Sequence, residues 1–384
     1  MLVDLPEVDA DAIAHSSLLA ETIIKRIDDR GGVIAFDEFM QALLYEPGLG
    51  YYSAASIKFG AQGDFITAPE ISALFGYALG EQCLKLFEQG CAPCVLEFGA
   101  GSGKLCAQLL EAANSIEKYQ ILEVSGDLKL RQQAYLREQL DSEVFARIEW
   151  LSAMPQDFDG VVIANEVLDA MPVNIVSRQQ HWQELGVAWL EGRFAWQLYA
   201  EDSAAVRQMQ QIEEGLGRLP EGYRSEINLN YQPWLAALAQ ACNRVAVLII
   251  DYGYEQQDYY HPGRSSGTLS CYFRHRVHAD PLIYPGLQDV TAFVDFDAVA
   301  DAAEAAQFEI CGLVSQRQFL IANGLLETAQ GLVEDLEGRA ALAIAQQVKT
   351  LTLGEEMGEK FKVLALQKNI GLEWPAMRRG VFHG

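Results

Sequence analysis

Short apolar runs alternate with helical patterns through the middle of the chain. Four runs are predicted to be strands, at 94–98, 119–124, 146–150 and 160–164. Connections of roughly 20 residues separate some of these runs, and the connection at 128–140 carries apolar residues at helical spacing. Alternation of this kind predicts a parallel sheet with helices on its faces.

The pattern changes on both sides of this segment. The first 90 residues are predicted to be mostly helical, because Leu19, Ile23 and Ile27 recur at helical spacing. After residue 173, an alternating stretch with a Glu-Gly turn predicts a hairpin at 181–199. Further elements are predicted as helices at 203–215 and 232–242, a buried strand at 245–251, and late strands at 308–314 and 361–367.

These patterns divide the chain into four parts. They are an N-terminal helical region (1–90), the first part of an α/β core (91–172), an insertion before the fifth strand (173–243) and the second part of the core (244–384). The last part contains a segment rich in Gly, Pro and aromatic residues, 252–296. This segment is too long to be only a connecting loop and is expected on the substrate side.

Charge and composition narrow the class of protein. The chain has 28 basic and 53 acidic residues, a net charge of −25. Nucleic acid is excluded as a partner, because phosphate binding needs clustered Lys and Arg, whereas a cationic partner would be attracted. No apolar run approaches the roughly 20 residues that span a bilayer. The N-terminus resembles neither a secretory signal nor a transit peptide, so a cytoplasmic location is expected.

The seven cysteines are scattered, which is typical of a reducing compartment. Cys91 and Cys94 form a CxxC pair, but this pair precedes a strand rather than a helix, and no second pair completes a zinc site. We therefore expect neither a redox pair nor a metal site.

The stretch "EFGAGSGK", residues 97–104, is a glycine-rich turn between a strand and a helix. A triphosphate-binding P-loop would need glycine at 98 and a hydroxyl at 105, where the chain has Phe98 and Leu105. A dinucleotide turn would need glycine at 104, where the chain has Lys104. Lys104 is then expected to face solvent in the first helical turn.

A cationic cofactor without phosphate fits the turn better. Gly99, Gly101 and Gly103 would let the backbone approach a ligand without a Cβ clash. Glu97 would lie near an ammonium group, and Glu123, which ends the next strand, lies where an acid takes ribose hydroxyls in the dinucleotide fold. S-adenosylmethionine has a sulfonium, an ammonium and a ribose diol, and is the expected cofactor.

Several motifs in order resemble the MidA-like family of class I S-adenosylmethionine-dependent methyltransferases. They are "GYYSAASIKFGAQGDFITAPEISALFG" (50–76), "LEFGAGSGKL" (96–105), "YQILEVSGDLKLRQQ" (119–133), "IANEVLDAMPV" (163–173), "LIIDYG" (248–253), "GTLSCYFRHRV" (267–277), "PGLQDVTAFVDF" (285–296) and "MGEKFKVLAL" (357–366). The resemblance implies a Rossmann-like sheet of seven strands, with 361–367 inserted antiparallel. It also implies methylation of a protein arginine, since mitochondrial members are protein arginine methyltransferases that assist assembly of respiratory complex I.

Acidic side chains at strand ends are the catalytic candidates, because ligands bind outside the carboxyl ends of strands in doubly wound sheets. Carboxylates can grip a guanidinium and stabilise charge as the methyl group moves. Glu166 and Asp169 follow the strand at 160–164, and Asp251 follows the strand at 245–250. Asn165, beside Glu166, is expected to contact the cofactor.

Two further segments carry candidates. "GDFITAPE" contains Asp64 and Thr67, which are expected to contact the cofactor because the resemblance places this segment over it; Thr67 to Glu70 also reads as a helix capping box. His275 and Asp289, in the segment 252–296, are expected to line the substrate channel or accept a proton, with Glu226 a weaker candidate of this kind.

The sequence therefore predicts an S-adenosylmethionine-dependent methyltransferase that acts on an exposed arginine of a partner protein. Two alternatives stay open: a small-molecule methyltransferase, and an assembly factor that binds the cofactor without significant turnover.

Overall fold

The computed structural model describes residues 5–54, 67–334, 336, 338–354 and 356–377. Its contacts divide the chain into two compact units, each made of separate chain segments. Unit 1 comprises residues 1–65, 169–233 and 255–295, and unit 2 comprises residues 66–168, 234–254 and 296–384.

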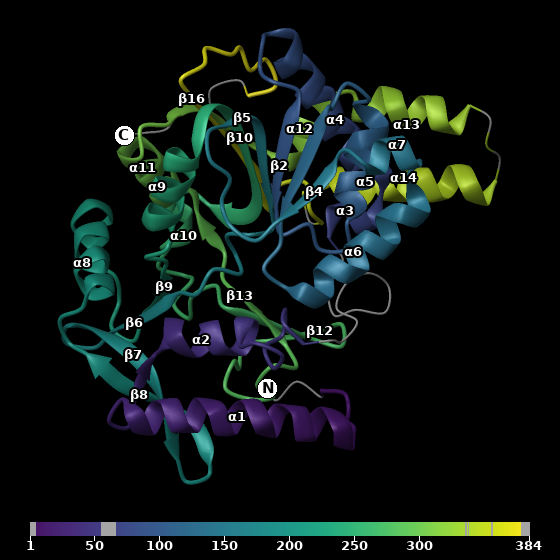
Figure 1. The fold of residues 1–384 in the computed structure, drawn as a ribbon. Coiled ribbons are helices and arrows are strands. Elements are labelled where there is room, and N and C mark those ends of the chain that lie inside the picture. The colour runs from purple at the N-terminus through teal and green to yellow at the C-terminus, as the bar shows by residue number, and fades with distance from the viewer. Residues whose placement is uncertain (1–4, 55–66, 335, 337, 355, 378–384) are drawn as a thin grey trace. The chain divides into compact units, whose positions relative to one another are not determined.

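Unit 2 contains the predicted α/β core (Figure 1). Its elements are α3 (Ala68–Ile71), α4 (Ala73–Glu88), β2 (Cys94–Phe98), α5 (Lys104–Ala112), β3 (Lys118–Leu122), α6 (Gly126–Gln139), α7 (Ser142–Phe145), β4 (Ile148–Leu151), β5 (Phe158–Asn165), β10 (Cys242–Tyr254), α11 (Phe296–Ala305), β15 (Glu309–Ser315), α12 (Gln316–Ala322), α13 (Leu325–Val333), α14 (Arg339–Thr352) and β16 (Phe361–Lys368).

Seven strands of unit 2 lie in the order β15-β16-β10-β5-β2-β3-β4. The five strands from β10 to β4 are parallel, whereas β16 runs antiparallel to both β10 and β15. The strand order reverses between β2 and β5, and such a switch point is where doubly wound sheets bind ligands. The predicted seven-stranded class I methyltransferase sheet, including its antiparallel late strand, is confirmed.

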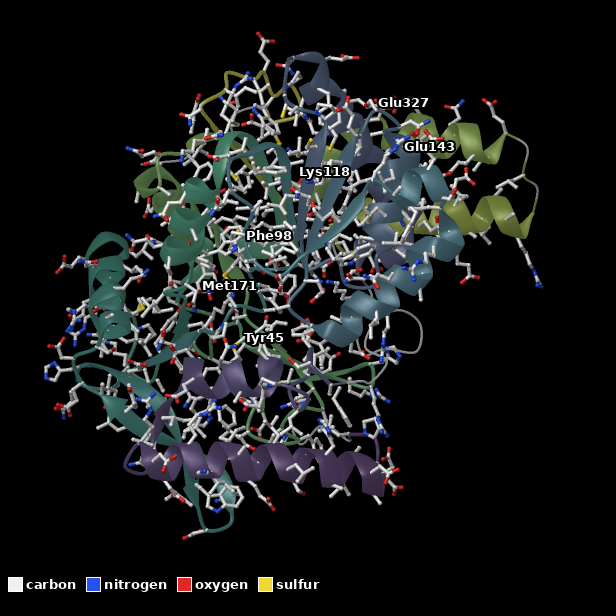
Figure 2. All side chains as sticks on the ribbon, viewed as in Figure 1. Tyr45, Phe98, Lys118, Glu143, Met171 and Glu327 are labelled. Atoms are coloured by element: carbon white, nitrogen blue, oxygen red, sulfur yellow. The ribbon has the colours of Figure 1, made fainter. Side chains whose placement is uncertain are left out.

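The central strands form because their residues are buried on both faces. In β5 and β10, runs of Val, Ile, Leu and Ala are almost fully inaccessible to water. A strand covered on both sides reads as a continuous apolar run rather than an alternating one. Figure 2 labels Phe98 at the carboxyl end of β2 and Lys118 at the opposite, amino edge of the sheet, at the start of β3.

Unit 1 contains the N-terminal helices and most of the insertion. Its elements are α1 (Ala10–Asp29), β1 (Ile34–Ala35), α2 (Phe36–Tyr45), β6 (Asn174–Arg178), β7 (Trp182–Leu190), β8 (Arg193–Ala200), α8 (Ala204–Leu216), β9 (Arg224–Ile227), α10 (Gln256–Tyr259), β11 (Ser270–Phe273), β12 (Arg276–His278), β13 (Asp289–Thr291) and β14 (Val294–Asp295). The helix α9 (Tyr231–Ala241) begins in unit 1 and continues into unit 2.

The hairpin predicted at 181–199 is confirmed as β7 and β8. Its turn residues, Glu191 and Gly192, both have positive φ, as a two-residue hairpin turn requires. In the sheet, β7 also pairs with β1 and β6, and β6 pairs with β9. A second, three-stranded sheet follows the order β12-β11-β13. The short strands β1, β6, β9 and β11 to β13 were not predicted from the sequence.

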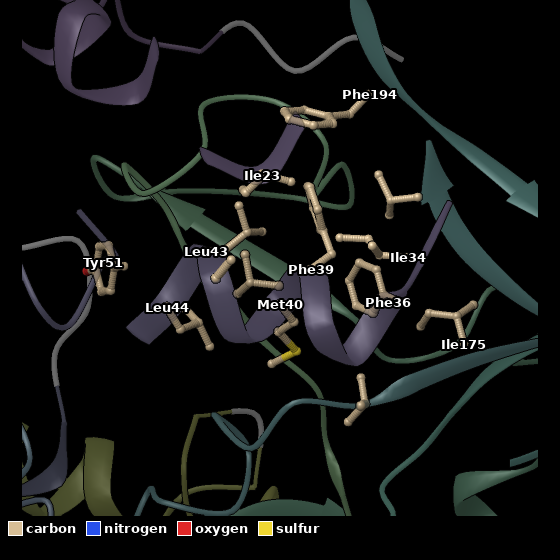
Figure 3. Packing of buried hydrophobic residues seen from close by; sticks show 14 of the residues in the cluster. Ile23, Ile34, Phe36, Phe39, Met40, Leu43, Leu44, Tyr51, Ile175 and Phe194 are labelled. Atoms are coloured by element: carbon tan, nitrogen blue, oxygen red, sulfur yellow. The ribbon is translucent and has the colours of Figure 1, made fainter. Parts of the chain in front are cut away.

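The core of unit 1 is formed by residues far apart in the chain (Figure 3). Phe36, Phe39 and Leu43 project from α2 and are fully buried. They belong to one cluster with Ile175 of β6 and Phe194 of β8, and Phe39 meets Phe194 edge-on with ring centroids 5.2 Å apart. Each such side chain contributes roughly 1.5–3 kcal/mol by leaving water. The N-terminal helices are therefore held by the insertion.

None of the helices in the described part of the chain is both long and apolar enough to span a bilayer.

Candidate active site

The glycine turn lies between β2 and α5, at the carboxyl edge of the unit 2 sheet. Gly99, Gly101 and Gly103 have φ values of +60°, +53° and +87°. L-residues with side chains rarely adopt this left-handed conformation, so the turn needs glycine at these positions for its own backbone. A ligand can therefore approach a stretch of main chain that carries few side chains.

Glu123 directly follows β3, beside this turn, and is held in place by its neighbours. Its carboxylate accepts hydrogen bonds from the Ser125 backbone N–H and from Gln132 Nε2, both at 2.9 Å. Gln132 Nε2 also donates to the Gly101 carbonyl at 3.1 Å, and Gln132 Oε1 accepts from Trp150 Nε1 at 3.0 Å. One buried amide thus links the acid to the glycine turn. Burial raises the pKa of Glu123 above its ordinary value.

Gln132 was not predicted as a site residue. It occupies the apolar stripe of α6, between Leu128 and Leu136 at intervals of four residues, and it is fully buried. A glutamine inside an apolar helical stripe is the signal that could have identified it, since buried amides must find hydrogen-bond partners.

Glu97 lies inside the sheet, with 2% of its surface exposed. Its carboxyl accepts a hydrogen bond from the Tyr119 hydroxyl at 2.8 Å and so links β2 to β3. Burial raises the pKa of Glu97 to about 8; Tyr119 opposes the rise and the nearby Glu123 adds to it. A role of Glu97 near the cofactor ammonium stays a prediction.

The raised pKa of Glu97 predicts a pH dependence of stability. Because the folded state holds this proton more tightly than the unfolded state, the stabilisation is complete below about pH 4.5 and is lost as the pH rises through about 8. The slope is at most about 1.4 kcal/mol per pH unit for one proton. We expect Glu97→Gln, which keeps an acceptor for Tyr119, to melt higher than the wild type at about pH 8 and to lose this advantage near pH 5.

Melting temperatures of both proteins, measured by differential scanning calorimetry across this range, check the prediction. Glu143→Gln, an exposed change on α7 (Figure 2), is the control for loss of one carboxylate. A constant difference between Glu97→Gln and the wild type at every pH would contradict it.

The end of β5 brings Asn165 and Glu166 to the same edge of the sheet. Asn165 pairs with Ile250 of β10, and the Glu166 backbone N–H donates to the Ile250 carbonyl at 2.8 Å. Glu166 has φ of +54°, a strained conformation for a residue with a side chain, and such strain clusters at functional sites. The Asn165 Oδ1 atom is buried and has no hydrogen-bond partner among the described residues, so it is available to a ligand donor.

Asp251 holds the turn that follows Glu166. It is fully buried, and its carboxylate accepts from the backbone N–H groups of Leu168 and Tyr252, both at 2.9 Å. These bonds place Asp251 as a positioning residue for the turn at 165–168; its predicted catalytic role stays a prediction.

The other candidates lie in unit 1. Asp289, on β13, accepts from the Tyr52 hydroxyl at 2.9 and 3.0 Å, and burial together with Asp289 and Asp169 raises the pKa of Tyr52 well above its usual range. Asp169 is 4% exposed, and its carbonyl accepts from the Ala292 N–H at 3.0 Å. Asp169 and Asp289, both buried, therefore lie close to the partly buried Tyr52.

His275 follows β11, three residues after Tyr272, which pairs with Asp289. It lies with Arg274 in the exposed turn between β11 and β12, and both residues have positive φ. Glu226 is buried and accepts from the Thr268 N–H at 2.9 Å, the Thr268 hydroxyl at 3.0 Å and the Leu269 N–H at 3.2 Å, which gives it a structural role.

The segment around Thr67 differs from its prediction. Asp64 lies outside the described residues. Thr67 is the N-cap residue of α3, but its side chain makes no capping hydrogen bond, so the predicted capping box is wrong. Glu70 instead accepts from Ser102 Oγ and Lys104 Nζ, both at 2.5 Å. Lys104 pairs with Glu70 and keeps 34% of its side chain exposed to solvent.

The described residues contain no group of three or more His, Cys, Asp or Glu side chains arranged to hold a metal ion. Burial raises the pKa of Cys91 to about 11 and also raises that of Cys94, so both thiols are protonated at neutral pH.

The strand order, the switch point and the glycine turn define a class I methyltransferase. A family model described as "Putative S-adenosyl-L-methionine-dependent methyltransferase" matches residues 78–314. The chain belongs to this family, and S-adenosylmethionine is its cofactor. Gly99, Gly101, Gly103 and Glu123 fit a ligand that carries a ribose diol and an ammonium group, as does the Asn165 Oδ1 atom, for which the described part of the chain provides no partner.

Known proteins match nearly the whole chain. A crystal structure of a protein from Burkholderia thailandensis, bound to S-adenosyl-homocysteine, is 38% identical, covers 98% of each chain and has a TM-score of 0.91. The curated relatives include proteins named protein arginine methyltransferase NDUFAF7 from Drosophila melanogaster (as a homolog) and Danio rerio. They are 29% and 27% identical, and the alignments cover 94% and 91% of this chain and 87% and 88% of theirs.

Proposed function

We propose that this chain is a protein arginine N-methyltransferase acting in the cytoplasm on a partner protein of the respiratory-complex type. The observation that carries the proposal is the likeness, over most of its length, to curated relatives named protein arginine methyltransferase. The nature of the partner rests on the resemblance to the MidA-like family. The net charge of −25 supports a cationic target, because an acidic surface attracts a basic segment.

Methyl transfer requires mainly that the protein position the arginine against the cofactor. S-adenosylmethionine supplies an electrophilic methyl group. Arginine stays protonated in proteins, so the enzyme must orient one nitrogen of the guanidinium and stabilise its charge. We assign this role to Glu166, whose carboxylate can accept from the planar guanidinium at the end of β5. The nitrogen becomes acidic once it carries the methyl group, so a strong general base is not required.

The proposal is tested with isotope-labelled cofactor. The purified protein is incubated with S-adenosyl-[methyl-³H]methionine and a lysate from source cells that lack the endogenous protein, and labelled products are identified by mass spectrometry. Methylarginine in a protein is the expected result. Label only in small molecules would overturn the proposal in favour of a small-molecule methyltransferase. Binding of S-adenosylhomocysteine without any labelled product would overturn it in favour of an assembly factor.

A further inference from the structure

The Glu70 carboxylate is inserted at the N-terminal end of α5, from a segment outside the sheet. Its side chain is 6% exposed and accepts from Ser102 Oγ and Lys104 Nζ, each at 2.5 Å. The short helix α3 that carries Glu70 is tied to α5 by a hydrogen bond from Gln108 Nε2 to the Pro69 carbonyl at 2.9 Å. A buried carboxylate is therefore fixed against the glycine turn.

This position usually attracts anions. In doubly wound sheets, the helix that follows the first strand points its free N–H groups and the positive end of its dipole at a phosphate. In this chain, α5 is a nine-residue helix whose N-cap is Gly103, which provides no capping side chain. Lys104 adds a positive charge in the first turn. With Glu70 removed, these groups would form an anion site beside the cofactor turn.

We propose that Glu70 determines cofactor selectivity. Its carboxylate neutralises Lys104 and occupies the Ser102 hydroxyl at the start of α5, so the glycine turn accepts a phosphate-free sulfonium nucleoside and rejects adenine nucleotides that carry a phosphate. A phosphate near this position would find Ser102 and Lys104 already held by a carboxylate, which would also repel it. The inference rests on the cofactor and is independent of the substrate to which the methyl group goes.

Two ligands that share an adenosine isolate this effect. 5′-Methylthioadenosine carries an uncharged sulfur at the 5′ position, and AMP carries a phosphate there. Dissociation constants for both are measured by isothermal titration calorimetry, and the ratio of the AMP constant to the methylthioadenosine constant reports selectivity. We expect this ratio to fall at least tenfold in Glu70→Gln through tighter binding of AMP. It should rise in Lys104→Met, which leaves the Glu70 charge uncompensated.

Glu143→Gln removes an exposed carboxylate and should leave the ratio unchanged. A merely structural role for Glu70 predicts that Glu70→Gln weakens both ligands by the same factor, and an unchanged ratio would overturn the proposal. Should Glu70→Gln fail to fold, as judged by its thermal melt, Lys104→Met decides. A higher ratio in that variant supports the proposal, and an equal or lower ratio overturns it.

Discussion

Gly101→Val is expected to abolish binding of S-adenosylhomocysteine while the protein stays folded. Gly101 has φ of +53°, where a β-branched residue is an outlier, and its carbonyl accepts the hydrogen bond from Gln132 that links the turn to Glu123. A left-handed conformation costs a residue with a side chain roughly 1–2 kcal/mol. Moving the backbone to relieve this strain would displace Glu123 and the turn together. Isothermal titration calorimetry measures the loss of binding.

Gly90→Val is the matched control. Gly90 has φ of +91°, and a Cβ atom there would meet nothing within 4 Å. The control carries a similar backbone penalty in unit 2 but lies after α4, away from the glycine turn. Its melting temperature should fall about as much as that of Gly101→Val, with cofactor affinity intact. Wild-type affinity in Gly101→Val would remove the turn from the cofactor site.

Glu166→Gln is expected to lower methyl transfer by about 100-fold or more, with cofactor affinity nearly unchanged. Glutamine keeps the shape of the side chain and the backbone bond from residue 166 to Ile250, but it loses the charge that would grip a guanidinium. Transfer of the labelled methyl group into protein measures the rate, and calorimetry with S-adenosylhomocysteine measures affinity.

The same assay with Glu143→Gln shows whether loss of any one carboxylate slows the reaction. If Glu166→Gln transfers methyl groups at the wild-type rate, Glu166 has no catalytic role. A parallel loss of cofactor affinity would assign it to cofactor binding instead.

The sheet of unit 2 could be predicted because its strands are buried on both faces. A continuous apolar run as short as 160–164 is typical of a buried strand, because a helix would need a longer segment. The strands β2, β3, β4, β5, β10, β15 and β16 all lie within a few residues of their predictions. The strands of unit 1 could not be found in this way. The segment 174–178 is fully buried yet includes Asn174, Ser177 and Arg178, because it pairs with β7 and β9 and Arg178 binds Glu213 of α8. Of these partners, β9 and Glu213 lie 35 or more positions away, so no local pattern reveals them.

The cofactor turn was predictable for a similar reason. Its glycines and Glu123 lie at fixed places in one β-α-β unit, where residues that are close in sequence are also close in space. Glu70 was misread because Thr67, Pro69 and Glu70 satisfy a local capping pattern. Glu70 instead accepts hydrogen bonds from Ser102 and Lys104, which lie more than 30 positions away. The hydrogen bond between Tyr52 and Asp289, 237 positions apart, could not be predicted from the sequence either.

The interleaving of the two units constrains the order in which the protein can be made. Phe36 and Phe39, synthesised near the start, complete their core with Phe194 and with Val290 near the end of the third segment. At about 5–20 residues per second, the ribosome needs roughly 15–50 s more to deliver these last partners. During that interval the apolar face of α2 has no finished core to enter. A nascent chain of this protein thus offers a binding surface to chaperones for most of its synthesis, and neither unit can be expressed by simple truncation.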